Sequence, residues 1–125
     1  MLIRKLMSPK PSIVAPQDTL GDARLLMERG NFRRLPVVEG ERLVGIVTDR
    51  DVLRRVGNLD SVKVKAAMTP DPIVVTPEMT VRDAVELMLS HKFSGFPVLE
   101  NGQVVGMLTT TDVLKAFLLV YPQTQ

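Results

Sequence analysis

Two kinds of hydrophobic pattern follow one another along this chain, and the same order occurs twice. The first is the three-to-four-residue spacing of an amphipathic helix, shown by Leu20, Ala23, Leu26 and Met27. Two short apolar runs follow, at residues 35–38 and 43–47, separated by the letters EGER. Such runs around a tight polar turn predict two buried strands.

The same order returns 61 residues later, so that residues 7–56 align with residues 68–117 without a gap. Helical spacing recurs at Val81, Ala84, Leu87 and Met88, and apolar runs recur at 96–99 and 104–108 around the turn ENGQ. Proline-bracketed apolar residues at 13–14 and 73–75 predict a very short strand before each helix. Self-similarity at a fixed offset indicates a duplication.

Each copy therefore predicts strand, helix, strand, strand, helix, with last helices that begin at Thr48 and Thr109. A chain of 125 residues is short for two independent domains, and halves that share one core are favoured. We expect an α/β (α+β) fold of two pseudo-symmetric repeats. Their predicted boundaries are 7–56 and 68–120, with a connector at 57–67.

Composition excludes several classes of function. The chain has no cysteine and one histidine, which excludes thiolate and multi-histidine metal sites and cysteine nucleophiles. No apolar run reaches signal-peptide or membrane-spanning length, so we expect a cytoplasmic protein with no membrane partner. No phosphate-loop, dinucleotide-binding or metalloprotease motif is present, and we expect no enzymatic activity and no metal.

The two halves differ in charge although the net charge is only +2. Residues 7–56 contain nine Lys and Arg against seven Asp and Glu, whereas residues 68–117 contain three against six. An anionic ligand should prefer the first half.

Three pairs of phrases resemble the cystathionine beta-synthase (CBS) domain family, whose members occur as tandem pairs called Bateman modules. They are MSPKP with MTPDP, RRLPVV with GFPVL, and GIVTDRD with GMLTTTD. The resemblance covers essentially the whole chain, and it implies a CBS pair with a ligand cleft between the repeats.

In this family the aspartate of the last phrase contacts ribose hydroxyls, with a threonine or serine three residues earlier nearby. The resemblance thus implies ligand-binding roles for Asp51 with Thr48 and for Asp112 with Thr109. It also implies that basic residues before LPVV, here Arg33 and Arg34, face phosphates. Apolar walls and backbone edges for an adenine are implied at Ile13, Val14, Val74 and Val75.

Each of these residues also has a purely structural explanation. T-x-x-D recurs at Thr19 and Thr80, and a threonine followed by an acid at the third helical position is a capping box. Arg33 and Arg34 would point to opposite faces of a strand, so at most one would face a ligand by strict alternation, and exposed arginines can simply solvate a strand edge. The apolar residues can simply be core.

We therefore expect a regulatory module that binds AMP, ADP or ATP and reports occupancy to an unknown effector protein or through self-association. It requires no obligatory cofactor, and S-adenosylmethionine is another ligand of the family. The alternative is a dimerisation or docking module with a non-functional cleft, with Leu114, Phe117, Leu118 and Val120 as candidate homodimer contacts. Nucleic acid is disfavoured, because the first-half arginines lack aromatic stacking residues.

Overall fold

The computed structural model describes residues 1–121 and confirms a mixed α/β fold. The chain forms two units, which we name after the repeat that dominates each. The first-repeat unit contains Pro11–Pro72 and Gly102–Val104. The second-repeat unit contains Met1–Lys10, Ile73–Asn101 and the described residues from Val105 onward.

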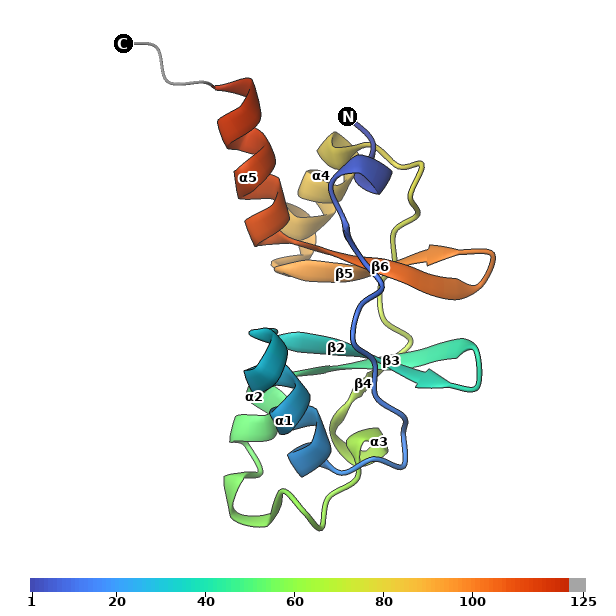
Figure 1. Cartoon of the computed structure of the whole chain (residues 1–125), viewed down its shortest axis with the longest axis vertical. Helices are drawn as coiled ribbons and strands as arrows, with labels where there is room; N and C mark the ends of the chain where they lie inside the picture. Colours follow the sequence, from blue (N-terminus) through green and yellow to red (C-terminus); the bar gives the residue numbers. More distant parts are fainter. Residues whose placement is uncertain (122–125) are drawn as a thin grey trace. The chain divides into compact units, whose positions relative to one another are not determined.

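The first-repeat unit is built on the hairpin of β2 (Arg34–Glu39) and β3 (Arg42–Thr48), with the short strand β4 (Thr69–Pro70) on the other side of β3 (Figure 1). Helix α1 (Leu20–Gly30) packs on α2 (Asp49–Leu53), and η2 (Val56–Asn58) and α3 (Val64–Ala67) follow. The two predicted helices and the predicted strands at 35–38 and 43–47 are confirmed.

Alternating residues of the hairpin turn inward and meet one stripe of helix α1. The buried cluster of this unit comprises Val14, Leu20, Ala23, Met27, Leu35, Val37, Val47, Val52 and Val64. The predicted strand at 13–14 is reduced to one parallel bridge, Val14 to Val37. Prolines on either side leave too few backbone N–H groups to extend this pairing into a ladder.

The second-repeat unit repeats the plan with β5 (Gly95–Glu100) and β6 (Gln103–Thr109), in the sheet order β1-β6-β5. Strand β1 is Ser8–Pro9, and the helices are α4 (Val81–His91) and α5 (Thr110–Val120). The predicted strand at 73–75 is again a single bridge, Val75 to Val98. The buried cluster of the unit comprises Ile3, Val75, Ala84, Met88, Phe96, Val98 and Leu108.

The N-terminal segment does not fold with the repeat that it precedes in sequence. Ile3, in the short helix η1 (Ile3–Lys5), is fully buried in the second-repeat unit, and its N–H donates to the Met79 carbonyl at 2.9 Å. Val64, 61 residues later, is equally buried in the first-repeat unit, and its N–H donates to the Asp18 carbonyl at 2.7 Å. Each unit is thus completed by the segment before the other repeat, so the units do not follow the repeat boundaries of the sequence.

A glycine in each last strand permits this exchange. Gly45 of β3 pairs with Pro70 of β4, and a Cβ atom at Gly45 would lie 2.9 Å from the Thr69 carbonyl oxygen. Gly106 of β6 pairs with Pro9 of β1, and its Cβ would lie 2.8 Å from the Ser8 carbonyl oxygen. The glycine shared by both phrases therefore serves the close approach of a short strand.

Candidate functional site

The first candidate pair, Thr48 and Asp51, lies where β3 ends and α2 begins. Thr48 is the N-cap, and its N–H and hydroxyl donate to Asp51 Oδ2 at 2.8 and 3.1 Å. The Asp51 N–H donates back to Thr48 Oγ1 at 3.3 Å. The Asp51 side chain is only 12% exposed, and its Oδ1 lies 3.8 Å from Arg54 Nη1. A half-buried carboxylate is therefore held in one orientation, with one oxygen committed to the cap.

The second pair, Thr109 and Asp112, repeats this geometry where β6 meets α5. The Thr109 N–H and hydroxyl donate to Asp112 Oδ2 at 2.9 and 3.1 Å, and the Asp112 N–H donates to Thr109 Oγ1 at 3.4 Å. Both residues are half-buried. Among residues 1–121, no ion pair involves Asp112, in contrast to Asp51.

Capping is a confirmed role for these pairs. Helix α1 has the same capping box from Thr19 and Asp22, and the Asp83 N–H of α4 donates to Thr80 Oγ1 at 3.1 Å. Asp22 and Asp83 are exposed, whereas Asp51 and Asp112 are half-buried. The cap therefore explains why T-x-x-D recurs, and burial distinguishes the two candidate ligand pairs from the other two.

The structure separates the two adjacent arginines. Arg34 is the first residue of β2 and pairs with Thr48 across the hairpin, which places both side chains on one face of the sheet. Burial lowers the pKa of Arg34 below its ordinary value; Asp49 opposes this effect and Arg50 adds to it. Arg33 lies before the strand with an exposed side chain, and its carbonyl accepts the Asp49 N–H at 2.8 Å. Arg34 is therefore the arginine placed beside Thr48.

The predicted adenine-contacting residues divide into two kinds. Val14 and Val75 are core side chains, 2% and 0% exposed. Their backbone carbonyls accept hydrogen bonds from the N–H groups of Val38 and Leu99, so these carbonyls are already engaged within the protein. Ile13 is 47% exposed and Val74 is half-buried, so these two are the ones with accessible apolar surface.

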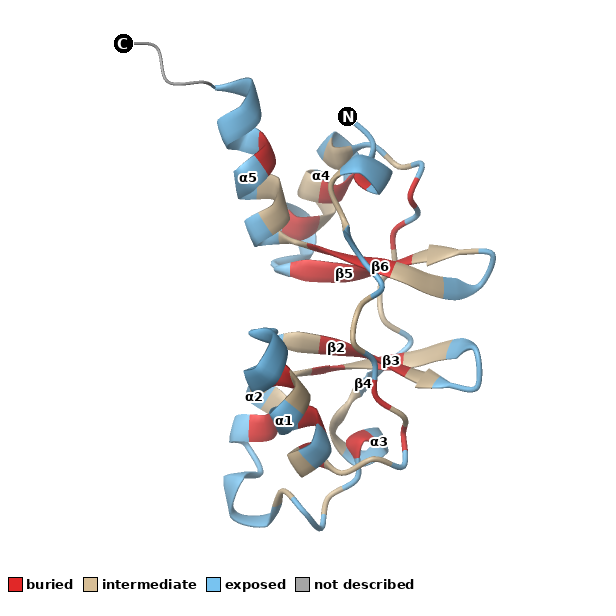
Figure 2. Cartoon of the chain, in the orientation of Figure 1, coloured by how far each residue is buried: buried red, intermediate tan, exposed pale blue. Residues whose placement is uncertain are grey.

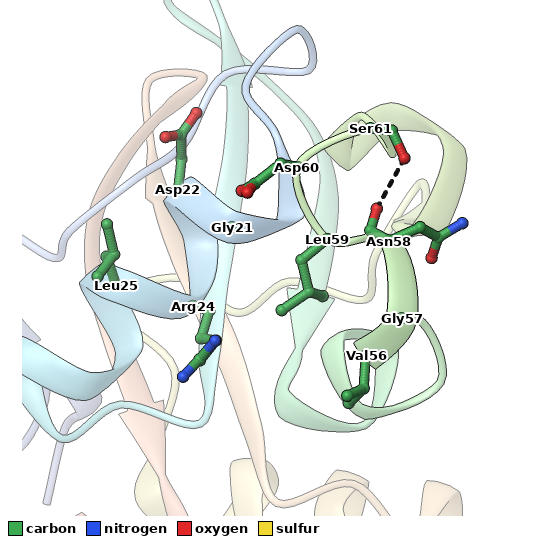
Figure 3. A pocket seen from close by; sticks show the side chains of 10 residues that line it. All are labelled: Gly21, Asp22, Arg24, Leu25, Val56, Gly57, Asn58, Leu59, Asp60 and Ser61. Carbon is green, nitrogen blue, oxygen red and sulfur yellow. Dashed lines mark hydrogen bonds between the residues drawn. The ribbon is translucent and has the colours of Figure 1, made fainter.

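A pocket that the sequence did not predict lies in the first-repeat unit, between the start of α1 and the segment around η2 (Figure 3). Its volume is about 660 Å³, and it is lined by Gly21, Asp22, Arg24, Leu25, Val56, Gly57, Asn58, Leu59, Asp60 and Ser61. None of the predicted site residues lines it. Gly21 leaves room for the Asp60 side chain against the first turn of α1, where negative charge is favourable. Only that glycine could have drawn attention to the segment, and the second repeat has Arg82 there.

The described residues carry no constellation for metal binding. Within residues 1–121 no three His, Cys, Asp or Glu side chains gather as metal ligands. No helix of the same residues has the length and apolar character needed to cross a membrane.

The fold agrees with the family comparison. The CBS domain matches twice, at residues 3–58 and 64–119, and the chain belongs to the CBS domain family as a tandem pair. An inosine-5′-monophosphate dehydrogenase of Korarchaeum cryptofilum is 43% identical over 101 residues. The match includes 80% of this chain but only 21% of that enzyme, so the likeness concerns about a fifth of the larger protein.

Two solved CBS pairs show the same fold with bound ligands. CBSX2 in complex with AMP has a TM-score of 0.85 and 30% identity, covering 96% of this chain and 98% of that one. The CBS domain pair of MJ0100, in complex with 5′-methylthioadenosine and S-adenosyl-L-methionine, has a TM-score of 0.83 and 27% identity, covering 94% and 95%.

Proposed function

We propose that this chain is a non-catalytic regulatory module that binds an adenine nucleotide at its Thr–Asp pairs. The ligand is AMP, ADP or ATP, with S-adenosylmethionine as the alternative. Occupancy is transmitted to an effector protein or through self-association. Ligand control of this kind requires that the nucleotide bind one state of the module more tightly than another.

The observation that carries this proposal is the fixed carboxylate of each pair. Oδ2 of Asp51 and of Asp112 accepts two hydrogen bonds from its own cap. Oδ1 of each carboxylate is outside the cap and can accept from a ligand, and Oδ1 of Asp51 also lies 3.8 Å from Arg54 Nη1. A carboxylate oriented in advance can accept from the two hydroxyls of a ribose without losing side-chain freedom on binding. CBS pairs similar to this chain have been solved with AMP and with two other adenosine compounds, which supports an adenosine ligand.

The first test is thermal unfolding with AMP, ADP, ATP and S-adenosylmethionine, each in large excess. A ligand at 100 times its dissociation constant stabilises the native state by about 2.7 kcal/mol, which raises the midpoint by several degrees. We expect a clear shift with at least one nucleotide.

The second test is calorimetric titration of the double variant Asp51→Asn and Asp112→Asn. Asparagine keeps an acceptor for the cap but loses the charge, and hydrogen bonds to charged groups contribute about 1.5–3 kcal/mol. We expect the affinity to fall roughly tenfold or more. The matched control is Asp22→Asn with Asp83→Asn, which alters the other two caps and should leave the affinity unchanged. Equal binding by both double variants would contradict the proposal.

A second candidate function rests on helix α5, most of which is exposed (Figure 2). The exposed large apolar residues of the helix and its C-cap are between 53% and 74% exposed, and they are Leu114, Phe117, Leu118, Leu119, Val120 and Tyr121. Lys115 is the only charged residue between Val113 and Tyr121. Contiguous exposed apolar surface on a helix is typical of a protein contact, and here it favours a docking or homodimer module.

Analytical ultracentrifugation, combined with the nucleotide titration, distinguishes the two candidates. Leu118→Glu introduces a charge at the centre of this surface and should convert a homodimer to monomers. The control is Leu89→Glu, which introduces the same charge at an exposed leucine of another helix, α4; Leu89 is 74% exposed. A parent that dimerises through α5 but binds no adenine nucleotide would favour the docking function alone.

A further inference from the structure

We infer that the two units select different ligands: the first-repeat unit takes an adenosine phosphate whose phosphate is bound by Arg34, and the second-repeat unit takes an adenosine derivative without phosphate. This inference rests on the proposed function, because it assigns a ligand class to each Thr–Asp pair.

The first step of the argument is the strand register in the first-repeat unit. Arg34 and Thr48 lie opposite each other at the open end of the hairpin. The Thr48 hydroxyl donates a hydrogen bond to Asp51 Oδ2. A cation and a fixed carboxylate therefore share one face of one sheet within this unit. A ligand that presents a diol to the carboxylate can present an anion to the guanidinium.

The second step concerns the charge around Arg34. Its pKa is lowered mainly by burial, yet a guanidinium remains charged at neutral pH. A partly desolvated cation attracts an anion more strongly than an exposed one does, because less water screens the interaction. Arg50 adds a second positive charge nearby, and Asp49 partly offsets both. Arg54 lies beside Asp51.

The third step is the corresponding set in the second-repeat unit. Gly95 replaces Arg34, Thr111 replaces Arg50 and Thr110 replaces Asp49, whereas Thr109 and Asp112 keep the geometry of the first pair. Gly95 is buried at the start of β5 and has no side chain to offer. Lys115 replaces Arg54, but among the described residues no ion pair joins it to Asp112.

The second-repeat unit therefore keeps the carboxylate that can bind a diol, Asp112, but lacks the arginines that lie near Asp51 in the first-repeat unit. Asp112 would repel a phosphate where no guanidinium offsets its charge. A neutral thioether or a cationic sulfonium attached to adenosine meets no such repulsion. The net charge of each half agrees with this assignment, because residues 7–56 have more Lys and Arg than Asp and Glu, whereas residues 68–117 have fewer.

The test is calorimetric titration with AMP and with 5′-methylthioadenosine against three single variants. Asp51→Asn and Arg34→Gln should each weaken AMP by roughly tenfold or more, as expected for loss of a charge-assisted contact, and should change 5′-methylthioadenosine by less than about threefold. Asp112→Asn should do the reverse. Arg42→Gln is the control for lost charge, since Arg42 is exposed at the far end of the same hairpin.

Two further arms sharpen the result. Adenosine and S-adenosylmethionine, titrated against the same variants, separate a neutral from a sulfonium ligand in the second-repeat unit. Gly95→Arg should add AMP binding in the second-repeat unit. Gly95 is buried, so this variant is informative only if it folds. If it does not fold, the result for Arg34→Gln decides whether the arginine binds the phosphate.

The outcomes separate this inference from the proposed function. If Arg34→Gln binds AMP like the parent, or if Asp51→Asn and Asp112→Asn weaken AMP equally, the assignment of ligand classes is wrong while nucleotide binding stands. If the folded parent binds none of these compounds, both are wrong.

Discussion

At the scale of single residues, the glycine of each repeated phrase has a structural reason that composition alone does not reveal. Gly45 lies close to Met68 and Thr69, where the exchanged strand β4 pairs antiparallel with β3. Any side chain there must displace backbone, and backbone in a paired strand moves less readily than a flexible side chain does.

We predict that Gly45→Ala lowers the free energy of unfolding by about 1–3 kcal/mol, the usual cost of inserting a methyl group into a packed site. Urea unfolding measures it. Gly57→Ala is the control, because a Cβ there meets no atom within 4 Å. Equal stability of the two variants would contradict this prediction and show that the pairing of β4 with β3 accommodates the methyl group without cost.

Residue identity predicted the caps well, because a threonine N-cap and an acid three residues later interact locally and need no tertiary information. It could not separate Arg34 from Arg33, since the choice depends on where β2 begins and on which residue faces Thr48. It also could not separate Ile13 from Val14, because both are apolar and only the bridge to β2 decides which one is buried.

At the scale of elements, the ends of the two matching helices use residues that differ in their tolerance of a left-handed backbone. Helix α1 ends at Asn31 with φ of 55°, and α4 ends at Lys92 with φ of 57°. Asparagine adopts this conformation more readily than lysine does, because its short polar side chain bonds locally. Glycine has no Cβ and adopts it at no steric cost.

We therefore predict that Lys92→Gly raises the free energy of unfolding by roughly 0.5–1 kcal/mol, as relief of the left-handed strain exceeds the added freedom of the unfolded chain. Thermal unfolding detects the rise. Lys92→Ala removes the same charge but keeps a Cβ, and it should not stabilise. A similar gain in both variants would assign the effect to charge instead.

Elements of ten residues or so were predictable because their hydrophobic period repeats several times. The two-residue strands β1 and β4 were not, because Ser8–Pro9 and Thr69–Pro70 have no period at all. Their proline content even argues against a strand, and they pair only along the edge of a longer one.

At the scale of the whole molecule, the exchange of N-terminal segments is the feature that sequence periodicity misses. Residues 1–6 correspond to residues 62–67, but the two segments share few residue types beyond Ile3 and Val64, which are both β-branched. Backbone bonds define the equivalence: the Arg4 N–H donates to the Pro77 carbonyl and the Lys65 N–H to the Pro16 carbonyl. In addition, the Arg4 side chain forms ion pairs with Glu78 and Glu100.

We predict that Ile3→Ala destabilises the second-repeat unit, although Ile3 precedes the first repeat in sequence. Truncating a fully buried isoleucine costs about 2–5 kcal/mol, because the apolar contact is lost and a cavity remains. Hydrogen exchange should report lost protection first in α4 and β5. Val64→Ala is the matched variant and should lower protection first in α1 and β2. Leu2→Ala, at a residue 38% exposed, is the control and should have a much smaller effect. If Ile3→Ala instead lowers protection first in α1 and β2, each N-terminal segment stabilises the repeat that follows it. The inferred exchange of N-terminal segments would then be wrong.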